Sequence, residues 1–257
     1  MKLKSVILAG IAALGLAGTV SAAPVKVGVA AEPYPPFTSP DASGKWSGWE
    51  VDLMNAICTD QKLDCVITPV AWDGIIPALT SGQIDMIMSS MSITAKRAKV
   101  VDFSDKYYVT PAAIAVAKDA TFGMTPEDLT GKVIGVQVST TNEAYAQKFF
   151  GKTSTIKQYQ TQDQVNQDLA AGRIDADVAD QFTLDAFVTS KDGKACCKML
   201  GALPYDNETL GTGIGAAFRK SDTALREKFN KGLADVRASG DYDKITKKYF
   251  SFDIYGG

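Results

Sequence analysis

One segment of this sequence occurs twice, once in each half of the chain. Residues 79–85 (LTSGQID) and 169–175 (LAAGRID) share leucine, glycine, isoleucine and aspartate at the same spacing. Each copy predicts the end of a helix, a glycine that terminates it and the start of a buried strand. A second pair of similar segments, KVGV at 26–29 and KVIGV at 132–136, lies upstream of the two copies in the same order. Two matched pairs predict two similar α/β lobes.

Strands and helices alternate around the repeat, as βαβ units require. We expect strands at 25–30, 66–70, 84–88, 133–138 and 214–218, and helices at 49–58, 72–79 and 222–239, the last opening on the capping pair Ser221-Asp222. The predicted fold class is therefore α/β with largely parallel sheets. In open sheets of this kind ligands bind beyond the carboxyl ends of the strands, so the residues that follow each strand are candidates for a binding site.

The amino-acid composition excludes several classes of function. The chain has 257 residues, of which 46% are hydrophobic and 22% charged, the balance of an ordinary globular protein. Its formal net charge is −2, and it has no Lys/Arg run of the kind that forms a nucleic-acid-binding patch. It contains no histidine, which excludes Ser-His and Cys-His catalysis and His-zinc sites. We expect no metal, no cofactor and no nucleic-acid partner.

Residues 1–23 have the pattern of a secretory signal peptide. Two lysines precede an apolar run at 6–18, and small residues follow. The run is shorter than the ~20 apolar residues of a membrane span, so we expect cleavage after Ala22 or Ala23 rather than membrane anchoring. The mature chain is expected to be a soluble exported protein.

The four cysteines agree with export to an oxidising compartment. Cys58 and Cys65 flank a six-residue segment. They predict a disulfide that joins a helix end to the next strand, with two buried free thiols as the alternative. Cys196 and Cys197 are adjacent. A vicinal disulfide, two free thiols and an intermolecular bond all remain open for this pair.

The expected strand at 84–88 runs directly into a hydroxyl-rich segment at 89–94. Arg97 lies about one turn into a helix that Thr94 can cap. Hydroxyls, free N–H groups and a guanidinium fork together match a carboxylate. The alternative is a serine-rich helix start followed by a solvated arginine.

Two other strand ends offer complementary groups. Residues 139–143 (STTNE) follow the strand at 133–138, and Thr140 and Glu143 fit a capping box. The N-terminus of such a helix can bind an anion while it is capped, although a plain cap is the simpler interpretation. Asp180 ends another apolar strand, where its carboxylate either accepts an ammonium group or caps the next helix.

Aromatic and acidic side chains follow the first strand and the second. Glu32 and Tyr34 come after the strand at 25–30, and Trp72 stands at a strand-to-helix junction. Aromatic faces hold aliphatic stems and cations, with packing in a lobe core as the alternative role. Together the strand ends offer an anion clamp, a cation acceptor and aromatic walls, which is complementary to a free amino acid or a derivative. The set has no nucleophile beside a base and no metal-ligand spacing.

In combination, these motifs resemble those of the periplasmic polar amino-acid-binding proteins of ABC importers, in particular the lysine/arginine/ornithine-, histidine- and opine-binding group. The resemblance covers the whole mature chain. It implies two α/β lobes joined by two hinge strands, with the ligand trapped between them. The motifs that carry it are YPPF at 34–37, GWEVDL at 48–53, IIPAL at 75–79, IDMIMSSMSIT at 84–94 with Arg97, FSD at 103–105 and YDKITKKYF at 242–250.

The resemblance also implies roles for single residues. Arg97 with two serines matches the first-lobe carboxylate site, Thr141 and its neighbours match the second-lobe helix terminus, and Asp180 matches the acceptor for the α-ammonium group. Glu32 stands where basic amino-acid binders carry an aspartate, and Gln137 stands where an apolar residue is usual. Cys58 and Cys65 match the disulfide of the basic amino-acid binders. The full set expected at the ligand comprises Glu32, Tyr34, Trp72, Ser89, Ser90, Ser92, Arg97, Gln137, Thr140, Thr141 and Asp180.

The family implies a first lobe at 24–110 and 208–257 and a second lobe at 111–207. It also implies a monomer in the periplasm that captures a polar amino acid, basic or amide-bearing, or an opine, and delivers it to the membrane subunits of an ABC permease. One alternative is a dehydratase of the same fold, with Glu143 or Asp180 as general acid. The other is a partner that presents its ligand to a membrane receptor.

Overall fold

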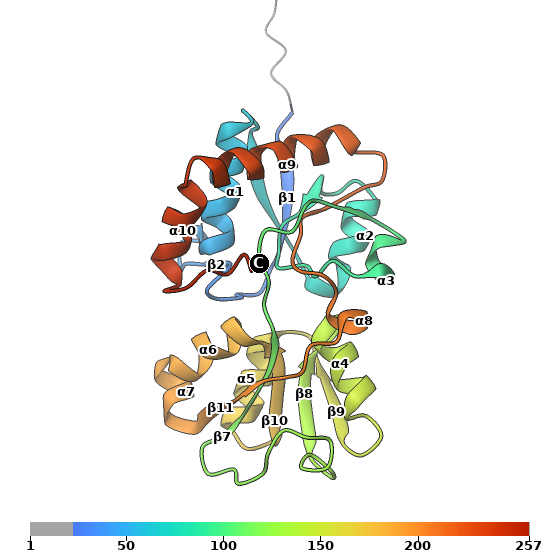
Figure 1. Cartoon of the computed structure of the whole chain (residues 1–257), viewed down its shortest axis with the longest axis vertical. Helices are drawn as coiled ribbons and strands as arrows, with labels where there is room; N and C mark the ends of the chain where they lie inside the picture. Colours follow the sequence, from blue (N-terminus) through green and yellow to red (C-terminus); the bar gives the residue numbers. More distant parts are fainter. Residues whose placement is uncertain (1–22, 257) are drawn as a thin grey trace, which may run out of the picture.

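A computed structural model describes residues 23–256 and contains two α/β lobes, one above the other along the long axis of the molecule (Figure 1). The predicted α/β fold class with two lobes is confirmed, but the prediction of largely parallel sheets is wrong. Both five-stranded sheets are mixed, because each contains antiparallel pairs where the chain returns from the other lobe or crosses to it. Apart from Ala23, the predicted signal peptide lies outside the described residues. No helix within 23–256 combines the length and the apolar character that a membrane crossing needs.

The first lobe is built on a five-stranded sheet in the order β4-β1-β5-β12-β6. Strand β1 is parallel to its neighbours β4 and β5, whereas β12 runs antiparallel to both of its neighbours. A small hairpin of β2 and β3 follows β1. The strands are β1 (Val25–Ala30), β2 (Ser39–Pro40), β3 (Trp46–Ser47), β4 (Cys65–Val70), β5 (Met86–Ile87), β6 (Asp102–Phe103) and β12 (Ala217–Phe218). The helices are α1 (Trp49–Asp60), the 3₁₀ turn η1 (Trp72–Gly74), α2 (Ile75–Thr80), α3 (Ala95–Ala98), α9 (Thr223–Ala238) and α10 (Asp241–Tyr249).

The second lobe has a sheet in the order β11-β7-β10-β8-β9. Its helices pack an apolar core against both faces of this sheet. The strands are β7 (Ala112–Ala117), β8 (Val133–Gln137), β9 (Thr155–Tyr159), β10 (Ala176–Asp180) and β11 (Cys197–Ala202). The helices are α4 (Thr141–Phe149), α5 (Gln162–Ala170), α6 (Gln181–Thr189), α7 (Lys191–Cys196) and the short α8 (Asn207–Leu210).

The repeated segment has the same structure in both lobes. Gly82 and Gly172 end their helices with φ of +79° and +65°, a left-handed conformation that favours glycine. The aspartate three residues later accepts a hydrogen bond from a backbone N–H of a strand in its own lobe, β1 in the first lobe and β8 in the second. The distances are 2.9 Å from Lys26 to Asp85 and 2.8 Å from Val133 to Asp175. This shared contact explains why both pairs of similar segments recur together.

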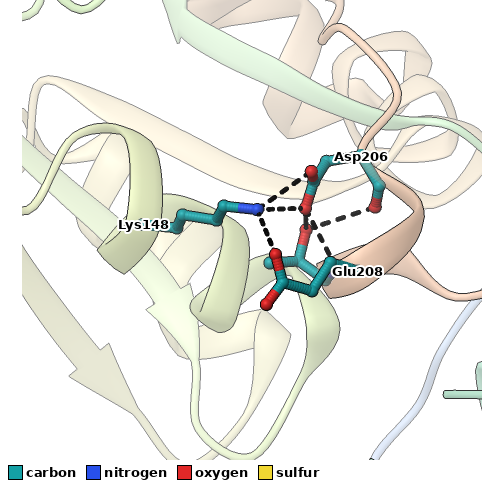
Figure 2. A network of polar contacts seen from close by, with 4 residues as sticks. Lys148, Asp206 and Glu208 are labelled. Carbon is teal, nitrogen blue, oxygen red and sulfur yellow. Dashed lines mark hydrogen bonds and ion pairs between the residues drawn. The ribbon is translucent and has the colours of Figure 1, made fainter. Parts of the chain in front are cut away.

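The chain crosses between the lobes twice, from β6 to β7 and from β11 back to β12. The two crossings lie side by side, because Tyr107 N–H donates to the Ile214 carbonyl over 2.8 Å and Ile214 N–H donates to the Tyr108 carbonyl over 2.9 Å. On the return, α8 is held against α4. Figure 2 shows Lys148 of α4 bound to the carboxylates of Asp206 (3.0 Å) and Glu208 (2.8 Å).

The return crossing then meets the first lobe at a glycine. Gly211 follows α8 with φ +82°, and a Cβ atom at this position would lie 2.1 Å from the carbonyl oxygen of Ile93. A side chain does not fit at that distance, so this close approach of two backbones requires glycine. The second-lobe end of the crossing is therefore fixed by ion pairs and the first-lobe end by backbone contact.

Several local predictions differ from the structure. Strands β5 and β12 are shorter than the expected 84–88 and 214–218, although Asp85 and Met88 still donate backbone hydrogen bonds to β1. The helix expected at 72–79 begins as the 3₁₀ turn η1 before α2. At the start of α9, Asp222 occupies the N-cap position without capping the helix. Its carboxylate pairs with Arg219 instead, at 2.7 Å, so the predicted Ser221-Asp222 cap is wrong. A charged partner three residues away competes for the oxygen that a cap would use.

All four cysteines form disulfides. Cys58, near the end of α1, is bonded to Cys65 at the start of β4, which confirms the predicted link between a helix end and the next strand. Cys196 and Cys197 are bonded to each other where α7 meets β11. Of the three states left open for the adjacent pair, the structure has the vicinal disulfide.

Candidate functional site

A cavity lies where the carboxyl ends of β1, β5, β8 and β10 face one another between the lobes. Together with the solvent-filled space at its mouth, it has a volume of about 420 Å³. All eleven residues predicted from the sequence line it, and two further lining residues, Ala30 and Asn142, did not stand out in the sequence. In the sequence, Asn142 lies within the segment at 139–143 that was predicted to cap a helix, so its side-chain amide was not singled out.

Arg97 is a half-buried cation at one end of the cavity. It lies in α3, whose first turn is capped by the Thr94 hydroxyl as expected, over 3.2 Å. Its guanidinium donates to the carbonyl of Ser92 in its own lobe and to the carbonyl of Ser139 in the other lobe, each over 3.0 Å. Its carbon atom Cζ lies 5.4 Å from the centre of the Trp72 ring.

The charge of Arg97 lacks a direct counter-ion. Burial lowers its pKa to about 10, against the attraction of Asp180, so the guanidinium stays charged at neutral pH. Within residues 23–256 it forms no ion pair. A buried charge without a partner is unfavourable, and an anion placed in the cavity removes that cost.

The N-terminus of α4 faces the same end of the cavity. Thr140 caps the helix by accepting from Glu143 N–H over 3.0 Å. The predicted capping box is only half formed, because the Glu143 carboxylate accepts from Ser139 N–H, one residue earlier than expected. Among the described residues no acceptor binds the backbone N–H groups of Thr141 and Asn142, both of which line the cavity. Free N–H groups at a helix start are suited to an anion.

Asp180 places a carboxylate beside this anion site. It accepts from the Tyr34 hydroxyl over 2.7 Å and from the Asn142 amide over 3.1 Å. Although Asp180 stands at the N-cap position of α6, its side chain does not cap that helix, so the helix-cap interpretation is wrong. Burial raises the pKa of Asp180, and the hydrogen bonds from Tyr34 and Asn142 and the charge of Arg97 oppose that rise.

The other end of the cavity carries a second carboxylate. Glu32 accepts from the side-chain amide of Gln137 over 3.0 Å, and the same amide nitrogen donates to the Gln160 carbonyl over 3.1 Å. Burial raises the pKa of Glu32, while hydrogen bonds from the backbone of Trp72 and from Gln137 lower it. The indole N–H of Trp72 is buried without a hydrogen-bond partner. With Arg97, Asp180 and Glu32 ionised, these three side chains carry one net negative charge.

The hydroxyls of Ser89 and Ser90 are bound within the first lobe. Ser89 Oγ accepts from Ala30 N–H over 2.9 Å. The Ser90 hydroxyl donates to Glu50 over 3.0 Å, and Ser90 N–H donates to the same carboxylate over 2.7 Å. Sequence reasoning missed Glu50, which occupies one position of the GWEVDL motif. The sequence feature that could have identified Glu50 is an acidic residue among apolar residues at the start of an amphipathic helix.

Side chains of the cavity join the two lobes. Besides the Tyr34–Asp180, Gln137–Glu32 and Arg97–Ser139 bonds, the hydroxyls of Ser92 and Thr141 lie 3.2 Å apart. Outside the cavity, Phe182 of α6 packs against Phe250 and Phe252 of the first lobe, with ring centres 5.4 Å apart in each case. The two lobes are thus in contact around an internal cavity.

Comparison with known proteins agrees with this architecture. Residues 25–252 match the family model of the bacterial extracellular solute-binding proteins, family 3. The chain is 40% identical to the L-arginine-binding protein of Pseudomonas aeruginosa, over 91% of this chain and 90% of that one. It is 39% identical to the histidine-binding periplasmic protein of Salmonella typhimurium, over 92% of each. A solved structure of an ancestral arginine-binding protein bound to arginine superposes with a TM-score of 0.81 at 37% identity, over 88% of this chain and 98% of that one.

Proposed function

Because the chain belongs to the bacterial extracellular solute-binding proteins of family 3, we propose that it binds a free amino acid in the cavity between its lobes. The observation that carries the proposal is the guanidinium of Arg97, which lines the cavity near the free N–H groups of α4 and has no counter-ion among residues 23–256. An α-carboxylate satisfies both groups at once. Asp180, beside them, accepts the α-ammonium group.

The ligand side chain then extends toward Glu32 and Gln137. Since Arg97, Asp180 and Glu32 together carry one net negative charge, a zwitterion with a cationic side chain neutralises the cavity. An amide-bearing side chain satisfies the same groups by hydrogen bonds. Trp72 and Tyr34 provide the aromatic walls. The preferred ligand class is therefore a basic amino acid or a conjugate of one, such as an opine, ahead of amide-bearing amino acids.

Binding is proposed to proceed by lobe closure. The ligand carboxylate first meets Arg97 and Ser92 on the first lobe, and closure then adds Thr141 and Asp180 of the second. The hydrogen bonds that join the lobes support this order, because they link residues of the two lobes only when the cavity is shut. The ligand shifts the equilibrium by its greater affinity for the closed form. The closed protein, exported to the periplasm and monomeric, delivers the amino acid to an ABC permease and catalyses no reaction.

A thermal-shift screen of refolded, ligand-free protein tests the proposal. The panel contains the standard amino acids, ornithine, citrulline, several opines and simple sugars. A ligand at 100 times its Kd stabilises the folded state by ~2.7 kcal/mol, which raises Tm by several degrees for a chain of this size. We expect a rise with basic amino acids or their conjugates and none with sugars. A flat profile from protein shown to be folded by circular dichroism contradicts the proposal.

Replacing Glu32 by glutamine tests the ligand class. The change removes the charge at the far end of the cavity and keeps a hydrogen-bonding group of the same size. We expect affinity for arginine, measured by isothermal titration calorimetry, to fall by about 10- to 100-fold, the range for a hydrogen bond to a charged group. Affinity for glutamine should change much less. Equal losses of affinity for arginine and glutamine would show that Glu32 does not recognise the charge of the ligand side chain.

The same site predicts a pH dependence. Because burial raises the pKa of Glu32, its charge is lost above the range of an ordinary glutamate as the pH falls. As the pH falls, the affinity of the wild type for arginine is therefore expected to decline at a higher pH than the affinity of the Glu32→Gln variant.

A further inference from the structure

Within residues 23–256, Phe182 is the only apolar side chain of the second lobe that packs against the main apolar core of the first lobe. It is the second residue of α6 and does not line the ligand cavity. Its ring centre lies 5.4 Å from that of Phe250, 5.4 Å from that of Phe252 and 6.5 Å from that of Phe37. Tilted rings at these separations attract one another. Phe37, Phe250 and Phe252 are called the aromatic cluster below.

The aromatic cluster lies at an edge of the first lobe that the second lobe covers. Phe37 and Phe250 are buried, whereas Phe252 is 51% exposed. Phe252 belongs to the C-terminal segment after α10, which is held to the first crossing between the lobes because Val109 N–H donates to the Ile254 carbonyl over 2.9 Å. Separation of the lobes at this edge removes Phe182 from the cluster and exposes more aromatic surface to water. The contact therefore favours the closed form.

Phe182 also stands two residues from a group that lines the cavity. Asp180 ends β10, and α6 begins at the next residue, Gln181. Gln181 N–H donates to the Pro111 carbonyl over 2.9 Å, which ties the start of α6 to the second lobe. On either side of this tie the chain reaches the first lobe, through the 2.7 Å hydrogen bond between Asp180 and Tyr34 and through the ring of Phe182. One polar and one apolar contact thus hold the junction of β10 and α6 against the first lobe.

We propose that Phe182 is a positioning residue for ligand binding: by packing against the aromatic cluster, it stabilises the closed lobes and keeps Asp180 in place at the cavity. The inference rests on the function proposed above and adds a residue that touches no ligand. Because the contact is the same whichever amino acid is bound, it raises the affinity for every ligand by the same factor. Phe182 acts on the strength of binding, whereas Glu32 acts on the choice of ligand.

Phe182→Ala tests this inference, with L-arginine and L-glutamine as probes in isothermal titration calorimetry. Alanine loses both ring pairs at 5.4 Å. We expect each probe that the wild type binds to bind about 5- to 100-fold more weakly, by the same factor for both probes. In stopped-flow tryptophan fluorescence the loss should appear mainly as faster dissociation, because the contact forms when the lobes close on a ligand that has already docked. A defect confined to packing within the second lobe would leave the dissociation rate unchanged.

Phe252→Ala removes the same contact from the first lobe. Because Phe252 is half-exposed, this variant should fold even if Phe182→Ala does not. We expect it to bind L-arginine about 2- to 10-fold more weakly, the effect of one aromatic pair. In the double variant Phe182→Ala/Phe252→Ala, the combined loss of affinity should be about 2- to 10-fold smaller than the product of the two single losses, since both substitutions remove the same pair. Independent effects would show that the two rings do not act through their contact.

Phe149→Ala is the matched control. Phe149 is 37% exposed, and its ring partner among the described residues is Tyr145, 4.4 Å away in the same helix of the second lobe. The substitution removes an aromatic pair that does not join the lobes, so affinity and dissociation rate should stay at the wild-type values.

Circular dichroism establishes that each variant is folded. The inference is overturned if the folded variants at positions 182 and 252 bind L-arginine with the wild-type affinity and dissociation rate, or if Phe182→Ala weakens the binding of one probe only. Titration of the wild type decides the proposed function separately. If the wild type binds no amino acid of the panel, the proposed function itself fails, and this inference fails with it.

Discussion

Arg97→Ala is expected to weaken binding of the preferred amino acid by about 30-fold to several-thousand-fold, which corresponds to ~2–5 kcal/mol for the removal of one partner of a buried, hydrogen-bonded charge pair. The reason lies in the ligand-free site. Arg97 is charged, half-buried at the cavity and without an ion pair in the described part of the chain, so its charge is available to the ligand carboxylate. Without it, that carboxylate is left with the Ser92 hydroxyl and the N–H groups of α4.

Arg97→Lys gives the matched comparison. Lysine keeps the charge but lacks the planar fork that binds both carboxylate oxygens. Its affinity should fall between those of the wild type and the alanine variant, as measured by calorimetry on protein stripped of ligand. Unfolding of each ligand-free variant should be followed in parallel, so that stability and affinity are reported separately. If Arg97→Ala binds the ligand with wild-type affinity, Arg97 does not bind the ligand carboxylate, and the proposed function loses its principal support.

Asp177→Asn is expected to change the pH dependence of stability by a large amount. Asp177 is 0% exposed, and its only side-chain hydrogen bonds within the described residues come from the Gln162 amide, at 3.0 and 2.9 Å. Burial raises its pKa from an ordinary 3.8 to about 7. At pH values between these two, the folded protein keeps a proton that the unfolded chain has released.

The sign of the effect follows from that difference. The unfolded state binds fewer protons, so the Asp177 contribution lowers the free energy of unfolding as the pH rises from about 4 to 7, and the loss is complete above the folded-state pKa. At 1.36 kcal/mol per pKa unit, the loss is on the order of 4 kcal/mol. Asparagine does not titrate, so the variant should lack this decline.

Urea unfolding at a series of pH values measures the difference directly. All other titrating groups are common to both proteins, so subtracting the two stability curves isolates Asp177. The difference should move in favour of the asparagine variant between pH 4 and pH 7 and stay constant above that. Two parallel curves would mean that Asp177 titrates as an ordinary aspartate in the folded protein.

Much of the fold follows from short-range patterns in the sequence. The repeated segments predicted two α/β lobes, because in each a leucine, a glycine with positive φ and the start of the next strand form one local unit. The rule that ligands bind beyond strand ends selected Ser89, Gln137 and Asp180 before their positions in space were known. The disulfide between Cys58 and Cys65 followed from their short separation.

Other features depend on contacts between distant parts of the chain. Glu50 and Ser90 are forty residues apart, and nothing near either of them in the sequence reveals that the carboxylate takes both polar hydrogens of the serine. The capping box at α4 is only half formed because the Glu143 carboxylate accepts from Ser139 N–H, one residue before the cap. The state of Cys196 and Cys197 is a local matter that the sequence left open, and the structure has the bond at the junction of α7 and β11.

The sequence by itself determined the class of the protein, its two lobes and the residues that gather around the cavity, because periodicity, capping and strand-end position depend on near neighbours in the chain. Only the tertiary structure decided what each of those residues does. It left Arg97 without a counter-ion, turned the Ser90 hydroxyl away from the cavity and joined Glu32 to Gln137 across the lobes. A side chain's free donors and acceptors are those that its packed neighbours leave unused, and packing brings together residues from every part of the chain.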